Sequence, residues 1–263
     1  AQSVAHLPTQ IFHPDDPGAS IDALVFSGHK TYTPGSPGVV IARKDHLLAI
    51  EPEEVGGGMV ERVLEDRYMV KETFPDREEA GTPNIPGAIA LVTTIEILDR
   101  IGMDVLMEEE DKILAKAVRG MAQMPEIIVY GGTDLESCPR AASISFNIRN
   151  LDHGLVAALL NDYFNIAVRN QCFCAHPYVK EMMADDLEAE FGIIDFGNMS
   201  PEFMRKAGMV RASFGLYSTM DDVDQLLLAL KDIIENAEVY GKDYVINSDN
   251  DYEHTTYRVD HGE

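Results

Sequence analysis

The stretch Asp22–Pro34, with the sequence DALVFSGHKTYTP, decides how this chain folds. Its first half belongs to the apolar run Ile21–Ser27, which is followed by glycine, histidine and lysine. A short, nearly continuous apolar run is typical of a strand buried on both faces of a parallel sheet. Lys30 would then lie at the carboxyl end of a strand, where open α/β sheets place their ligands. This position suits a ligand site at Lys30, but from these residues alone an ordinary surface turn is the favoured interpretation.

The residues beside Lys30 suit a lysine that holds a cofactor. A lysine amine that is withdrawn from water is neutral enough to attack an aldehyde. Ser27 and His29 can donate hydrogen bonds to a phosphate, and Gly28 lets the backbone approach a ligand closely. These residue types are compatible with an aldehyde cofactor that carries a phosphate group, and an ordinary surface turn is compatible with them as well.

The composition narrows the class of protein. The chain has 263 residues, of which 45% are hydrophobic, and this is ample for a packed core. Its formal charge of −24 repels nucleic acid and anionic membranes. We find no apolar run of about 18 residues and no signal-peptide pattern, so we expect a cytoplasmic protein. Three cysteines, an odd number, do not make a disulfide framework, so their chemistry would be reactive or metal-binding.

The rest of the chain alternates between helix and strand patterns. Caps and apolar spacing predict a largely buried helix from Pro86 to Gly102 and a helix after Thr219, where Asp222 completes a capping-box spacing. Further elements are expected as strands at 37–42, 126–130, 143–148 and 166–169, and as helices near 107–123 and at 152–164. Residues 181–206 suggest an inserted loop, and the segment after Asn247 a loose polar tail.

Four blocks of sequence, in order, resemble the class V aminotransferase family, which includes the cysteine desulfurases. Asp22–Pro34, with Gly38 beyond it, resembles the family's lysine segment. The other blocks are Ala1–His6, Glu79–Asn84, and Arg169–Pro177 followed by Arg211–Ser213. Together they span roughly positions 1–235, and four ordered blocks are more specific than any single motif.

The resemblance implies an α/β fold, the C-terminal part of a pyridoxal-phosphate enzyme of fold type I. It implies three regions: 1–92 as a partial large cofactor-binding sheet domain, 93–246 as a small α+β domain, and 247–263 as a polar tail. Members of the family work as homodimers with pyridoxal 5'-phosphate. By this resemblance Lys30 would form the Schiff base, Gln2 would contact the phenolic oxygen of the cofactor, and Ser27 and His29 would bind its phosphate. Thr82 would reach the phosphate in the site of the neighbouring subunit.

The same resemblance assigns the substrate residues. Arg211 would bind the carboxylate of a small amino acid, a task that suits a planar guanidinium with two parallel donors. Arg169 is a second candidate, and a surface ion pair is the alternative for Arg211 in so acidic a chain. Cys174 occupies the position of the desulfurase nucleophile, and a nearby His176 would help to keep its thiol deprotonated.

Two other interpretations of the cysteine segment stay open. Cys172, Cys174 and His176 alternate as residues on one face of a strand would, and they could bind a metal, although a second ligand pair is missing. The two cysteines could also be inert, partly buried thiols. The segment departs from the commonest desulfurase pattern in two ways: Gln171 stands where glycine is frequent, and Cys172 is extra.

The family's aspartate that pairs with the pyridine nitrogen lies upstream of the block at Ala1–His6, so we expect this chain to be a fragment. The predicted function is a cysteine desulfurase-like reaction, cysteine to alanine plus an enzyme persulfide, with cysteine or a similar amino acid as substrate and an acceptor protein for the sulfur. The alternatives are a class V aminotransferase or lyase that leaves sulfur alone, and a non-catalytic remnant that kept the dimer surface.

Overall fold

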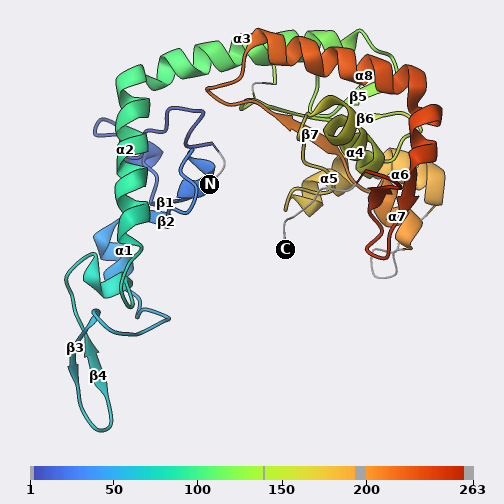
Figure 1. Ribbon diagram of the computed structural model, residues 1–263. Coiled ribbons are helices and arrows are strands. Elements are labelled where there is room, and N and C mark those ends of the chain that lie inside the picture. Colours follow the sequence, from blue (N-terminus) through green and yellow to red (C-terminus); the bar gives the residue numbers. More distant parts are fainter. Residues whose placement is uncertain (1–2, 139, 193–199, 258–263) are drawn as a thin grey trace. The chain divides into compact units, whose positions relative to one another are not determined.

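The chain forms two compact units, Ala1–Met107 and Glu108–Glu263, in the computed structural model shown in Figure 1. The structure describes residues 3–138, 140–192 and 200–257. Each unit has its own elements and is described by itself. The regions expected at 1–92, 93–246 and 247–263 stay predictions.

The first unit is built from two small hairpins and a long helix. Its elements are η1 (Pro17–Ala19), β1 (Ala23–Ser27), η2 (Gly28–Lys30), β2 (Gly38–Ala42), α1 (Lys44–Leu48), β3 (Val60–Val63), β4 (Tyr68–Val70), η3 (Asp76–Glu78) and α2 (Ile85–Ile101). Both hairpins are antiparallel, and β1 pairs with β2 so that Ala23 faces Ala42 and Ser27 faces Gly38. The helix α3 (Met103–Ala122) begins in this unit and ends in the second.

The strand β1 differs from its prediction. It was expected to be buried on both faces of a parallel sheet, but among the described residues it pairs only with the antiparallel β2. Val25 is 56% exposed, and Val40 on β2 is 63% exposed. A two-stranded ribbon has no neighbouring layer to cover both faces, so apolar side chains that suit a larger sheet remain open to solvent.

The helix α2 begins and ends where the sequence predicts, but it is less buried. Asn84 caps it by accepting a hydrogen bond from the Gly87 amide at 3.1 Å, and Gly102 follows its end with a φ of 94°. Leu91 and Leu98 are buried, whereas Ile89 is 63% exposed. The prediction of a largely buried helix is therefore wrong for the described chain, because unit 1 supplies partners for only one side of it.

The second unit is an α+β fold around a three-stranded antiparallel sheet of order β5-β6-β7. Its elements after α3 are β5 (Ile127–Val129), β6 (Ser143–Ile148), α4 (His153–Phe164), α5 (His176–Met182), α6 (Ala184–Phe191), α7 (Pro201–Lys206), β7 (Val210–Ser213), α8 (Met220–Tyr240), η4 (Gly241–Asp243), β8 (Tyr244–Ile246) and β9 (Tyr252–His254). Side chains of α3, α4 and α8 form the core with the sheet, and Phe146, Leu159 and Leu230 in it are fully buried.

Several predicted elements of this unit are confirmed and three differ. The capping box at α8 is present, with the Thr219 amide donating to Asp222 Oδ2 at 2.7 Å. The strand expected at 166–169 is reduced to one bridge between Arg169 and Arg211. The described part of 181–206 is mostly helical, because Met183, Leu187 and Phe203 pack into a second core cluster.

The segment after Asn247 also differs from the expected loose tail, as far as it is described. The strand β9 pairs with β8, so that Tyr252 faces Ile246. The Tyr252 hydroxyl donates to Asp152 Oδ2 at 2.5 Å, which ties the hairpin to the start of α4. In the part of the chain that the structure describes, no helix combines the length and apolar character needed to cross a membrane.

Candidate functional site

The turn that carries Lys30 has a fixed backbone. The Gly28 amide donates to the Pro37 carbonyl at 3.1 Å, and the Thr31 amide donates to the Gly28 carbonyl at 2.8 Å. A Cβ atom on Gly28 would lie 2.1 Å from Ser36 Oγ, which is closer than real side chains come. Glycine is therefore required here, and the turn places Lys30 directly after the end of β1, as the sequence predicts.

This turn is also attached to α2. Thr33 is buried, and its hydroxyl donates to Thr94 Oγ1 at 2.8 Å. The Asn84 side-chain amide, at the start of α2, donates to the Gly35 carbonyl at 2.7 Å. Two hydrogen bonds between residues far apart in sequence thus hold the lysine turn against α2.

The side chains on the turn are more open than expected. Lys30 and His29 are exposed, and Ser27 is half-buried. The expectation of a lysine withdrawn from water is not met in the described chain, because the β1–β2 ribbon has no layer above the turn. The three side chains still offer an amine, an imidazole and a hydroxyl on consecutive or nearly consecutive positions.

The segment Glu79–Asn84 lies beside the glycine run Gly56–Gly58. The Gly81 amide donates to the Gly57 carbonyl at 2.6 Å, and Gly81 has a φ of 81°. Thr82 is exposed on this segment. Gln2 lies outside the described residues.

In the second unit, Arg169 and Arg211 are brought together by the backbone. The Arg211 amide donates to the Arg169 carbonyl at 2.7 Å, and the Arg169 amide donates back at 3.1 Å. The Arg211 guanidinium carbon lies 4.9 Å from the centre of the Phe173 ring. Arg211 is half-buried, and its Nε has no hydrogen-bond partner among the described residues. Burial, and next the charge of Arg169, lower the pKa of Arg211.

The loop between these arginines holds the two cysteines in an unusual backbone. Gln171, Phe173 and Cys174 have φ angles of 75°, 52° and 61°, which is the left-handed region. The loop is pinned at Gln171, whose carbonyl accepts from the Met209 amide at 3.0 Å. A glycine at position 171 would adopt this φ without steric cost.

The two cysteines differ in their surroundings. Cys172 is half-buried, its thiol donates to the Ala207 carbonyl at 3.5 Å, and burial raises its pKa. Cys174 is exposed. The expected alternation on one strand face is wrong because the cysteines lie in a turn. Within the described ranges, no group of three or more histidine, cysteine or acidic side chains could hold a metal ion.

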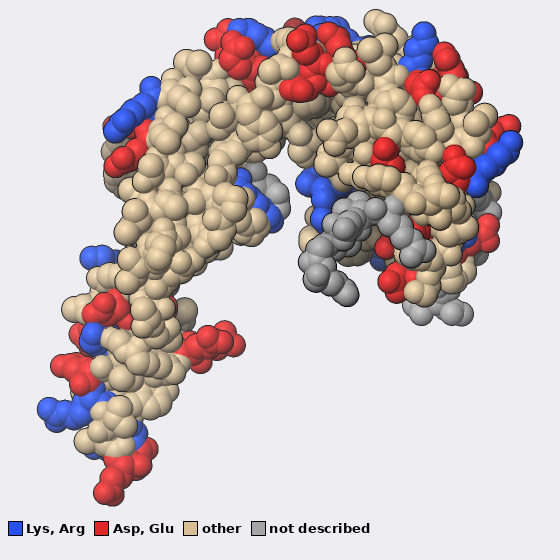
Figure 2. Space-filling view, viewed as in Figure 1, with Lys and Arg blue, Asp and Glu red and all other residues tan. Residues whose placement is uncertain are grey.

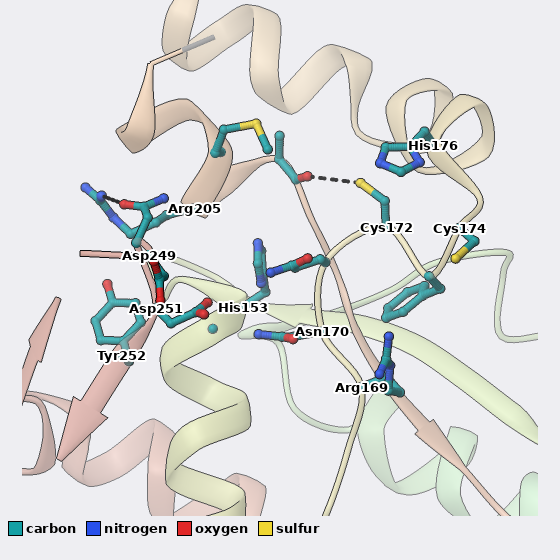
Figure 3. Close-up of a pocket in the computed structure, with 16 residues that line it drawn as sticks. His153, Arg169, Asn170, Cys172, Cys174, His176, Arg205, Asp249, Asp251 and Tyr252 are labelled. Carbon is teal, nitrogen blue, oxygen red and sulfur yellow. Dashed lines mark hydrogen bonds between the residues drawn. The ribbon is translucent and has the colours of Figure 1, made fainter. Parts of the chain in front are cut away.

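A pocket of about 270 Å³ opens beside this loop (Figure 3). Cys172, Cys174 and His176 line one part of it, and His153, at the start of α4, and Asp249–Tyr252 line another. The sequence reasoning missed His153 and the Asp249–Tyr252 wall. No local signal separates His153 from an ordinary first residue of a helix, and the hairpin reaches the pocket only through tertiary contacts.

Comparison with known proteins places the chain in a family. The sequence pattern described as Aminotransferase class-V matches residues 1–226, so the chain belongs to this family of pyridoxal-phosphate-dependent enzymes. Among its relatives, a probable cysteine desulfurase of Pyrococcus abyssi is 32% identical over 237 residues, which are 90% of this chain and 51% of that protein. A cysteine desulfurase of Enterobacter sp. is 33% identical over 81% of this chain and 45% of its own length.

Solved structures agree with this assignment. A cysteine desulfurase from Thermococcus onnurineus matches with a TM-score of 0.73 and 32% identity, over 90% of this chain and 51% of its own. One from Escherichia coli matches with a TM-score of 0.70 and 28% identity, over 89% and 50%. The predicted family and the predicted fold, part of the type I pyridoxal-phosphate fold, are confirmed. The chain spans about half the length of the relatives it matches.

Proposed function

We propose that this chain is the lysine-bearing and cysteine-bearing part of a cysteine desulfurase. The observation that carries the proposal is the half-buried Arg211, whose Nε lacks a partner among the described residues and whose guanidinium contacts Phe173. The next residue is Cys174, with an exposed thiol. A cation that can bind a carboxylate, Arg211, and a nucleophile that can attack a sulfur atom, Cys174, therefore lie on a strand and on the loop beside it.

The lysine turn fits pyridoxal phosphate. Gly28 leaves no room for a Cβ atom, so the backbone of the turn is narrow where Ser27, His29 and Lys30 emerge. In the proposed site the Lys30 amine holds the aldehyde carbon, and Ser27 and His29 bind the phosphate. Gln2 and, from a neighbouring copy, Thr82 complete it. When bound, the cofactor supplies an acceptor for the electrons released as bonds to the amino acid break.

Arg211 is suited to the carboxylate of the substrate. A buried guanidinium donor without a partner costs free energy, about 1–3 kcal/mol for an unsatisfied group, and a carboxylate that accepts from it removes this cost. Arg169 beside it adds a second positive charge, and burial, followed by this charge, lowers the pKa of Arg211. An anionic ligand relieves both effects.

Cys174 is the nucleophile of the proposed reaction. Its thiolate attacks the sulfur atom of the bound cysteine, the carbon–sulfur bond of the substrate breaks, and the sulfur remains on Cys174 as a persulfide, while the carbon skeleton leaves as alanine. Cys172 is the poorer candidate, because burial raises its pKa and its thiol is engaged by the Ala207 carbonyl. The help expected from His176 stays a prediction, as do a homodimer and an acceptor protein for the sulfur.

The cofactor part is tested on the purified chain. Pyridoxal phosphate is added, the imine is reduced with borohydride, and the modified lysine is mapped by mass spectrometry. We expect the adduct on Lys30, its loss in Lys30→Ala, and its retention in Lys44→Ala, which removes another exposed lysine of the same unit. An adduct spread over surface lysines in all three proteins contradicts the proposal.

The sulfur part is tested on the protein with the upstream half of the fold restored. Cys174→Ala should abolish sulfide release from cysteine and keep the Lys30 adduct, while Cys172→Ala should keep both. Sulfide release that survives Cys174→Ala would contradict the role of this thiol, and an absence of sulfide release from the unchanged protein would favour the alternative, a class V aminotransferase or lyase that leaves sulfur alone. Arg211→Lys should raise the KM for cysteine, because an ammonium cannot give two parallel hydrogen bonds.

A further inference from the structure

The hairpin of β8 and β9 lies outside the residues 1–226 that the family pattern matches, and it holds the helix α7. The contact is made by Asn250, in the turn between the two strands. Its side-chain amide donates to the Pro201 carbonyl at 2.9 Å, and its Oδ1 accepts from Arg205 Nη1 at 2.5 Å. One side chain of the hairpin therefore binds both ends of this short helix.

A second side chain of the hairpin supports the same helix. The Tyr252 hydroxyl donates to Asp152 Oδ2 at 2.5 Å. The Asp152 side chain is 12% exposed, and its carboxylate also lies 3.5 Å from Arg205 Nε and 3.0 Å from Lys206 Nζ. Hydrogen bonds to charged groups are stronger than those between neutral groups. The hairpin thus holds α7 through two separate contacts, one direct and one through Asp152.

The loop that carries the two cysteines is supported by the three residues that follow α7. The Cys172 thiol donates to the Ala207 carbonyl at 3.5 Å, drawn as a dashed line in Figure 3. The Gln171 carbonyl accepts from the Met209 amide at 3.0 Å. Between these two contacts, a Cβ atom on Gly208 would lie 2.9 Å from Gln171 Cα. The loop therefore packs directly on the backbone that leaves α7.

This loop depends on such support. Gln171, Phe173 and Cys174 have positive φ, a conformation that persists where the surrounding structure fixes it. The Cys174 side chain is exposed, so its direction follows from the backbone of the loop and not from packing around the thiol. A shift of α7 would move the support of the loop, and the thiol would move with it.

We propose that Asn250 is a positioning residue for Cys174: it holds α7 and, through α7, the segment that supports the cysteine loop, Asn170–Ala175. The inference rests on the proposed function, since it concerns the placement of the proposed nucleophile. A thiolate attacks a sulfur atom efficiently when the two atoms are held in line and close together, and a displacement of about 1 Å can cost ~100-fold in rate. The C-terminal hairpin thus contributes to the reaction without touching the substrate.

The turn allows variants that change one contact at a time. Asn250 has a φ of 68°, which glycine and aspartate also adopt. Asn250→Gly therefore removes both side-chain hydrogen bonds without straining the turn, and Asn250→Asp keeps the acceptor for Arg205 but loses the donor to Pro201. Tyr252→Phe removes the second contact. Asp249→Gly is the matched control, because it adds the same freedom to the unfolded chain at an exposed neighbouring residue.

The first measurement uses the chain itself. Alkylation by iodoacetamide is followed by mass spectrometry in one sample, with the exposed Cys138 as the internal reference. We expect Cys172 to react more slowly than Cys138, and this protection to fall at least ~fivefold in Asn250→Gly, less in Asn250→Asp, and not in Asp249→Gly. Circular dichroism checks that each variant is folded. Protection that is unchanged in both Asn250→Gly and Tyr252→Phe overturns the inference.

The second measurement uses the protein with the upstream half of the fold restored. Counted per Lys30 adduct, kcat for sulfide release should fall about tenfold in Asn250→Gly, with partial rescue in Asn250→Asp. The KM for cysteine should stay unchanged, because Arg211 is held in the sheet by β6. An unchanged kcat, or an equal fall in Asp249→Gly, overturns the inference. Failure of the proposed function would show itself differently, as no sulfide release from the unchanged protein or as release that survives Cys174→Ala.

Discussion

Three residues of the cysteine loop adopt a left-handed backbone conformation that residues other than glycine rarely adopt. Gln171, Phe173 and Cys174 all have positive φ. Such residues cost of order 1–3 kcal/mol each and persist where the surrounding structure fixes them. Here the fixing contacts are hydrogen bonds from the Met209 amide to the Gln171 carbonyl and from the Ala175 amide to the Cys172 carbonyl. The strain is located where the proposed nucleophile must be held in one direction.

Gln171→Gly should stabilise the second unit. Glycine removes the strain at a φ of 75° but adds freedom to the unfolded chain, which costs roughly 0.5–1 kcal/mol, so we expect a net gain of about 0.5–1 kcal/mol. Urea unfolding followed by circular dichroism measures it. Gln171→Ala shortens the side chain and keeps the strain, so it serves as the control. An equal gain in both variants would show that the side chain, and not the backbone, is responsible.

His153 should make stability fall in acid. Burial lowers its pKa in the folded chain, so the unfolded state binds the proton more tightly than the folded state does. The neutral ring is at no disadvantage above the unfolded pKa, about 6.5, and stability is lost as the pH falls from there through the folded pKa. The difference in unfolding free energy between the chain and His153→Gln should therefore change below neutral pH. A difference that stays constant down to pH ~5 would contradict a buried neutral imidazole.

At the scale of elements, the lysine turn is the part whose shape depends most on one residue. Gly28 is enclosed by Ser36 and by the Pro37 carbonyl, so an added methyl group meets atoms at 2.1 Å and 2.8 Å. The hydrogen bond from Thr33 to Thr94 ties the same turn to α2. A change at Gly28 should therefore be felt along the helix as well as at Lys30.

Gly28→Ala should destabilise the first unit by roughly 1–3 kcal/mol, the usual cost of forcing extra atoms into a packed site. Hydrogen exchange of the β1 and α2 amides, followed by mass spectrometry, reports it. Adding Ser36→Ala to this variant removes the nearest clashing atom and leaves the Pro37 carbonyl, so we expect partial rescue. Complete rescue would mean that only the serine hydroxyl excludes a side chain.

Elements set by local chemistry were predictable, and those set by distant contacts were not. Asn84 and Gly102 bound α2, and Thr219 with Asp222 begins α8, because caps act within a few residues. The helices between 181 and 206 form because Leu187 and other apolar side chains pack into a second core cluster. No local sequence pattern predicts this cluster. The same limit applies to the site: Lys30, Arg211 and Cys174 stand in recognisable motifs, whereas His153 shares a pocket with the C-terminal hairpin only through tertiary contacts.

At the scale of the whole molecule, the order of the motifs predicted the family correctly. The burial of apolar side chains in unit 1 was predicted wrongly. Val25 and Ile89 were expected in a core, yet they are 56% and 63% exposed. Both expectations assumed a sheet with more layers than the described residues provide. The chain spans about half the length of its relatives. Its first unit exposes large apolar side chains on β1, β2 and α2.

This apolar surface should be measurable on the chain alone. Figure 2 shows few charged side chains over α2, where Ile89, Val92 and Ile97 are each more than half exposed. Exposed patches of this kind bind hydrophobic dyes and promote association. We expect the chain to enhance the fluorescence of anilinonaphthalene sulfonate and to associate with rising concentration. Ile89→Lys with Val92→Lys should reduce both and leave the circular dichroism spectrum unchanged, whereas the same pair of changes at the exposed Leu228 and Val239 of α8 should leave dye binding by unit 1 in place. Dye binding that is insensitive to the α2 changes would mean that these side chains are covered in solution, by a second copy or by a rearranged first unit, and light scattering at low concentration would tell those two states apart.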